Sequence, residues 1–199
     1  MIRDRASPIL RKRDPHLRPF AAAFASLALT LVAGPAGATP QANAGLTVGG
    51  ALTDMRTAAG PRAAFHLGAR GDVLFLRRRD RDMGIGPYVE FATEAFDTLE
   101  LGAGASWLVP GWTFPFVFSA GAFERQARGQ GWEPGVASSI FVGPRSYNFH
   151  SSYDLAGGLF VQARYGLGDA RQADIVLGAQ IDLTLLAYPL IFAYAAVRR

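Results

Sequence analysis

The stretch from His150 to Asp154 holds three residue types that hydrolases use for nucleophilic chemistry: an imidazole, a hydroxyl and a carboxylate. Alternate side chains of an extended strand point to the same face, so His150, Ser152 and Asp154 would lie side by side. A histidine beside a serine can accept the serine proton, which makes this stretch a candidate catalytic site. The alternative is a set of hydrogen bonds at the mouth of a strand.

The spacing of His150 and Ser152 is similar to the His-x-Ser of the outer-membrane lipid A deacylases. This resemblance implies a lipid-modifying hydrolase. The sequence departs from that family in two ways. Tyr153 stands where the family has asparagine, and the alternation places these residues on the polar face of their strand, whereas the family's site faces lipid.

A second group of ionisable residues recurs on one face of the expected strands. Charges taken out of bulk water need partners, so we expect these side chains to plug a narrow lumen with ion pairs and hydrogen bonds. A narrow path for ions or small solutes is the alternative. The residues are His66, Arg70, Asp72, Glu90, Glu94, Glu100, Arg164, Asp174 and Asp182.

Other chemistry has no signature in the sequence. No glycine-rich phosphate loop joins a strand to a helix, and the chain has three His and no Cys, without metal-ligand spacing. We therefore expect no cofactor and no metal. Residues 1–38 hold six basic and two acidic residues, whereas the rest of the chain has fourteen of each, so the net charge of +4 belongs to the N-terminal segment. The basic composition thus gives no reason to expect nucleic-acid binding.

Residues 1–38 have the layout of a signal peptide. A basic stretch precedes the apolar run from Phe20 to Ala33, and an Ala-Gly-Ala cleavage site ends at Ala38. A second candidate site ends at Ala44, and an uncleaved anchor helix is the alternative. We expect a signal peptide over 1–38, a linker over 39–44 and a barrel domain over 45–199. An exported chain without Cys has no disulfides.

The elements that position the candidate residues are strands. In residues 154–165 and again in 174–185, apolar side chains alternate with small or polar ones, and a turn-rich segment separates the two arms. Each arm has roughly the length of a tilted strand that crosses a bilayer. Such a hairpin fits a soluble barrel with its apolar face inward, or a transmembrane barrel with its apolar face in lipid.

The same alternation predicts strands over 45–56, 62–76, 84–95, 99–109 and 114–122, and a last strand over 188–197. Residues 124–150 break the pattern and are predicted to form one long loop, in which Val136–Val142 is a helical turn or an extra strand. The count is eight strands, or nine to ten if the loop contains strands. With both chain ends in the periplasm, eight strands place the long loop outside the cell.

The polar face favours a membrane barrel. It consists mainly of Gly, Ala and Ser with isolated charges, and no Lys follows residue 38. A convex surface in water would carry bulkier charged residues, whereas small residues suit a narrow lumen. We therefore predict an all-β fold, an antiparallel up-and-down transmembrane β-barrel. A soluble periplasmic barrel that binds an apolar ligand is the alternative.

The predicted signal peptide, alternation and Gly and aromatic content make the chain resemble the small outer-membrane β-barrel proteins of Gram-negative bacteria. This resemblance implies a location in the outer membrane after cleavage, contact with outer-membrane lipids and lipopolysaccharide, and insertion by the barrel-assembly machinery. We expect a monomer with a non-enzymatic structural or surface-interaction role. One departure is the C-terminus, because such proteins end in an aromatic residue and this chain ends in Val197-Arg198-Arg199.

Overall fold

The computed structural model describes residues 40–57, 60–79, 81–111, 113–127, 131–145, 155–168 and 172–197. Eight strands follow one another in these residues, and a helix comes after the last strand. The elements are β1 (Gln41–Thr53), β2 (Arg62–Leu74), β3 (Gly84–Glu94), β4 (Thr98–Val109), β5 (Phe116–Ala127), β6 (Trp132–Val142), β7 (Gly157–Gly166), β8 (Ala173–Asp182) and α2 (Leu183–Val197).

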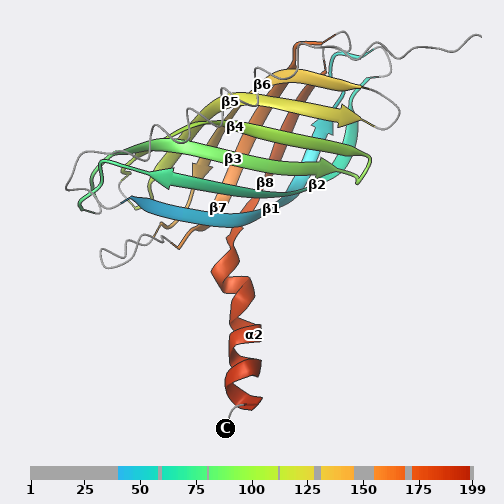
Figure 1. Ribbon diagram of the computed structural model, residues 1–199. Helices are drawn as coiled ribbons and strands as arrows, with labels where there is room; N and C mark the ends of the chain where they lie inside the picture. Colours follow the sequence, from blue (N-terminus) through green and yellow to red (C-terminus); the bar gives the residue numbers. More distant parts are fainter. Residues whose placement is uncertain are drawn as a thin grey trace, which may run out of the picture. The chain divides into compact units, whose positions relative to one another are not determined.

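The strands form a closed antiparallel barrel in which each strand pairs with its neighbours in sequence (Figure 1). β1 pairs with β8 from Gly45 opposite Asp182 to Leu52 opposite Ile175, and this pairing closes the ring. We call the end where β1 begins and β8 ends the terminal mouth, and the opposite end the far mouth. The predicted all-β fold with eight antiparallel strands is confirmed.

The alternation of each strand separates two kinds of surface. Large apolar side chains lie on the outside, where Val89, Leu159 and Leu177 are 61%, 66% and 62% exposed. Charged side chains lie inside, where Arg164 and Asp182 are 3% and 0% exposed. A cluster of buried apolar residues shares the interior. The barrel is thus inverted relative to a soluble protein, with its charges buried and its large apolar residues exposed.

The segment expected to be one long loop contains β6 and the last residues of β5. These two strands pair from Phe116 opposite Val142 to Gln126 opposite Trp132. The remaining connection, 143–156, joins β6 to β7 at the terminal mouth. The prediction of a continuous loop over 124–150, at the end opposite the chain termini, is therefore wrong. The alternative of an extra strand over Val136–Val142 is confirmed, because β6 contains these residues.

The predicted last strand over 188–197 is also wrong, because this segment belongs to the helix α2. β1 already occupies the free edge of β8, so no edge is left for a further strand. A helix satisfies its own backbone hydrogen bonds without such an edge. The count of eight holds because β6 replaces this strand. At the other end of the chain, β1 begins at Gln41, inside the expected linker 39–44.

The start of α2 is fixed by Asp182, the last residue of β8. One carboxylate oxygen of Asp182 accepts a hydrogen bond from the backbone N–H of Thr184 at 2.7 Å, and the other accepts one from Ala156 at 2.8 Å. Asp is a favoured residue at a helix start because it satisfies an otherwise unpaired N–H. Among the described residues no helix is long and apolar enough to cross a membrane.

Candidate functional site: a charged network inside the barrel

The inward positions of β2, β3, β4, β5, β7 and β8 bring distant ionisable residues into one interior. All nine residues predicted for the lumen face lie inside the barrel, and their side chains are buried. The cause is the two-residue period of a strand, which sends every second side chain to the same side. The structure also shows which of these residues pair with one another. The pairs depend on which strands face each other across the interior.

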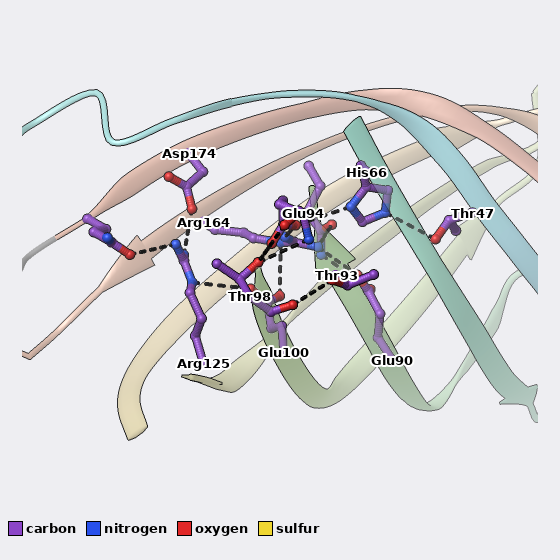
Figure 2. Close-up of polar contacts among 12 residues, drawn as sticks. Thr47, His66, Glu90, Thr93, Glu94, Thr98, Glu100, Arg125, Arg164 and Asp174 are labelled. Atoms are coloured by element: carbon purple, nitrogen blue, oxygen red, sulfur yellow. Dashed lines mark hydrogen bonds and ion pairs between the residues drawn. The ribbon is translucent and has the colours of Figure 1, made fainter. Parts of the chain in front are cut away.

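Arg164 on β7 lies at the centre of the network (Figure 2). Its guanidinium is 3.1 Å from Glu90 and 2.9 Å from Glu100, and it also pairs with Glu94. These three carboxylates come from β3 and β4, which lie across the lumen from β7. Gln162 accepts a further hydrogen bond from Arg164 at 3.0 Å. One buried guanidinium thus contacts three buried carboxyl groups. Such an arrangement is stable only when every buried charge has a partner.

Arg125 extends the network toward the far mouth. It lies 3.6 Å from Glu100 and 2.5 Å from Asp174, and donates a hydrogen bond to Gln172 at 2.8 Å. Sequence reasoning missed Arg125 because residues 124–150 were expected to form a loop. The signal was present, since the inward face of β5 continues at every second position from Val117 to Arg125.

Arg70 contacts residues of several strands in the middle of the lumen. It donates hydrogen bonds to Glu90 and Ser139 at 3.2 and 3.3 Å, and to Ser106 at 3.2 Å. It also bonds Ser119 and stacks on the ring of Tyr88, with its guanidinium carbon 4.0 Å from the ring centroid. The three serines lie on the small polar face that the sequence shows, but nothing in the sequence indicated that they share one arginine.

A second pair of charges lies toward the terminal mouth. Arg145 donates two hydrogen bonds to Asp72, at 2.9 and 2.7 Å, in the two-pronged geometry that arginine forms with a carboxylate. Both side chains are buried. Arg145 was also missed, because it comes after β6 in the segment expected to be a loop.

Thr47, His66 and Glu94 form a hydroxyl–imidazole–carboxylate series. The Thr47 hydroxyl is 3.1 Å from His66 Nε2, and His66 Nδ1 is 3.2 Å from a Glu94 oxygen (Figure 2). Hydrolytic triads have the same order of contacts. All three residues are buried, however, and Glu94 is also engaged by Arg164 and Thr98. The series therefore acts as part of the buried network.

The space beside this series is too small for a substrate. A cavity lined by Thr47, Arg70, Glu90 and Gln180 has a volume of about 10 Å³. That is room for one water molecule. Side chains therefore fill the barrel at this level, and no chemistry on an organic substrate fits there.

The candidate residues His150, Ser152 and Asp154 lie outside the described residues. Within the described part of the chain, no group of three or more His, Asp or Glu could hold a metal ion. Comparisons with models of known protein families, with curated proteins and with solved structures found no match to this chain.

Proposed function

We propose that this chain is a membrane-spanning β-barrel of the bacterial outer membrane, with a side-chain-filled lumen and a structural or surface-interaction role that is not catalytic. The observation that carries this proposal is the inverted distribution of side chains. Leaving a large apolar side chain in water costs about 1.5–3 kcal/mol relative to burying it. The outer face carries such residues on every strand, and lipid is the solvent that removes this cost.

Strand length supports the same proposal. The strands have 10–13 residues. A tilted strand needs about 9–11 residues to cross the hydrocarbon core of a bilayer. Ring closure by β1 and β8 also leaves no unpaired sheet edge, which a bilayer would not tolerate.

The lumen supports a role other than solute passage. The ion pairs of Arg164, Arg125, Arg70 and Arg145 lie at successive levels of the interior, and the cavity beside Thr47 holds one water at most. A barrel filled in this way supports its wall from inside and presents its connections at the two mouths. Conduction would require several buried pairs to separate together.

The proposed location requires export. Cleavage after Ala38 leaves β1 whole, whereas cleavage after Ala44 would remove Gln41–Ala44, which include the buried side chains of Gln41 and Asn43. We therefore favour Ala38 as the cleavage site. The partners that follow are outer-membrane lipids, lipopolysaccharide and the barrel-assembly machinery.

The experiment is expression of the full chain in a Gram-negative host, followed by fractionation and gel migration of unboiled and boiled samples. We expect the protein in the detergent-extracted outer-membrane fraction, with a mobility shift on boiling and a mature N-terminus at Thr39. Reconstituted liposomes should show no conductance above background. A chain that stops at Gln172 lacks β8, cannot close the ring and is the control without a shift. Protein released by osmotic shock without detergent would contradict the proposal.

The same cells test the lipid hydrolase hypothesis. Expression of the chain should leave the mass spectrum of lipid A unchanged, and Ser152→Ala should make no difference. Loss of an acyl chain from lipid A that depends on Ser152 would replace the non-catalytic role with an enzymatic one.

A further inference from the structure

The connections between the strands differ in charge, and the excess of basic residues lies in one of them. The four connections at the far mouth together hold three Arg and three Asp, so they are neutral. At the terminal mouth, the β4–β5 connection has no charged residue and the β6–β7 connection has one Arg and one Asp. The β2–β3 connection, residues 75–83, holds four Arg and two Asp, a net charge of +2.

The structure of the β2–β3 connection leaves three arginines available to an anion. One carboxylate oxygen of Asp82 accepts hydrogen bonds from the backbone N–H groups of Arg78 and Arg79, at 2.9 and 2.8 Å. This carboxylate therefore holds the backbone of the turn. Arg78, Arg79 and Arg81 are exposed, and their guanidinium groups form no ion pair or hydrogen bond with any described residue. Arginine is well suited to phosphate, which it can bind through two parallel hydrogen bonds.

An apolar surface begins next to this turn. Met83 and Ile85, at the start of β3, are 57% and 49% exposed. Ile85 lines a hollow on the outer face of β3–β7 and lies opposite Trp107 of β4, which lines the same hollow. From Arg81 to Ile85 the chain spans at most about 13 Å. One leaflet of a bilayer, headgroups included, is about 20 Å thick. A single lipid molecule can therefore reach both the turn and the hollow.

The hollow has a floor of small side chains. Ala105, Ala120, Ser138 and Ala163 lie directly opposite one another on β4–β7. Its volume of about 500 Å³ is room for about sixteen methylene groups, each taken as the roughly 30 Å³ of a liquid water molecule. That is the size of a lipid acyl chain. A flexible chain needs no wall on every side, because neighbouring lipids cover it.

We propose that the β2–β3 turn and this hollow together bind one anionic phospholipid of the periplasmic leaflet. The phosphate lies on Arg78, Arg79 and Arg81, and an acyl chain lies over the small floor. The inference rests on the proposed function, in which the terminal mouth faces the periplasm. Trp107 then lies between the headgroup and the acyl chain, the depth at which tryptophan is enriched in membrane proteins.

The net charge of the turn favours an anionic headgroup over a zwitterionic one. A zwitterionic headgroup brings its own ammonium group to the arginines, whereas a headgroup such as phosphatidylglycerol brings only the phosphate. Each Arg near an anionic membrane surface strengthens binding roughly fivefold. Lipopolysaccharide offers phosphates of similar chemistry, but it belongs to the other leaflet, at the far mouth, where the connections are neutral.

Quenching of Trp107 by brominated lipids tests the site. The chain has three Trp, so Trp112→Phe and Trp132→Phe leave Trp107 as the only one. The barrel is reconstituted in phosphatidylcholine vesicles that contain a small fraction of brominated phosphatidylglycerol, or the same fraction of brominated phosphatidylcholine. We expect brominated phosphatidylglycerol to quench Trp107 about fivefold more strongly per molecule.

Removing the arginines should abolish this preference. In a chain with Arg78→Gln, Arg79→Gln and Arg81→Gln, we expect the two brominated lipids to quench Trp107 equally. The matched control carries Arg56→Gln, Arg128→Gln and Arg171→Gln, which remove the same charge from the far-mouth connections. It should keep the preference.

Filling the hollow tests the position of the acyl chain. Ala120→Phe places a ring on the floor and should lower the quenching by brominated phosphatidylglycerol, because the chain is displaced. Ala69→Phe, on the outer face of β2, is the matched control and should leave the quenching unchanged. A heat-dependent mobility shift of both variants shows that the barrel is closed.

Three results would overturn the inference. They are equal quenching by the two lipids with all arginines present, a preference that survives loss of the three arginines, and displacement of brominated phosphatidylglycerol by lipopolysaccharide more effectively than by unbrominated phosphatidylglycerol. Its failure is distinguishable from failure of the proposed function. Equal quenching by both lipids would refute the phospholipid site alone, whereas no quenching by either lipid would refute the membrane location.

Discussion

The two faces of the barrel use the same strands in different ways. On β8, Val176 points inward and is fully buried, whereas the next residue, Leu177, points outward and is exposed. Inside, each charge depends on a few named partners, as Arg164 depends on Glu90, Glu94 and Glu100. At the outward positions, the only requirement is that the side chain is apolar. The inner face should therefore be sensitive to the identity of each residue and the outer face only to its polarity.

The largest expected effect is on the inner face. Arg164→Met removes the cation that holds three buried carboxylates, and breaking such a pair by removing one partner costs about 3–5 kcal/mol. Urea unfolding of the barrel in lipid vesicles, followed by tryptophan fluorescence, measures this loss. Arg79→Met, at an exposed position in the β2–β3 connection, should change stability by less than about 0.5 kcal/mol. A stable Arg164→Met barrel would mean that the ion pairs do not hold the inner face.

The next effect is on the outer face. Leu177→Arg should destabilise the barrel by about 2–4 kcal/mol if this position lies near the bilayer midplane. Leu177→Met keeps the side chain apolar and should have little effect. The same unfolding experiment in vesicles measures both variants. If arginine were tolerated as well as methionine, the outer face would not be in lipid and the contrast between the two faces would fail.

The smallest effect is in a turn that belongs to neither face. Ala95 and Phe96, between β3 and β4, have positive φ angles of 50° and 60°. Residues with a side chain rarely adopt this conformation, so Ala95→Gly should stabilise the barrel by up to about 1 kcal/mol. Ala103→Gly, in the regular strand β4, should instead destabilise it by about 0.5–1 kcal/mol. Equal shifts in the two urea midpoints would show that the turn is not strained.

The sequence was sufficient for the strands that alternate cleanly. β1–β4 and the β7–β8 pair were predicted to within a few residues, because a barrel with unlike faces repeats every two residues. β6 was predicted only as an alternative, over Val136–Val142, because Pro134 and Gly135 lie near its start and are typical of turns. The helix α2 was missed because its residues are apolar at both odd and even positions. Such a run fits a buried strand or a helix equally well.

The sequence predicted which residues face the interior but not which of them contact one another. Alternation placed nine ionisable residues on the inward face without saying which of them meet. Arg164 and Glu90 are 74 positions apart, and their contact depends on the register of every strand between them. Arg125 and Arg145 were lost with the misassigned loop, although they pair with the predicted residues Asp174 and Asp72.

The pairing of β1 with β8 also determines when the chain can fold. Gly45, in the first strand, finds its partner Asp182 only in the last one. Contacts between residues so far apart in sequence slow folding, because the whole intervening chain must be ordered before they form. β1 can pair with β2 early, but its other edge stays unpaired until β8 is in place. We expect folding to finish in one late step, and a chain interrupted before β8 to persist as an open intermediate that proteases degrade.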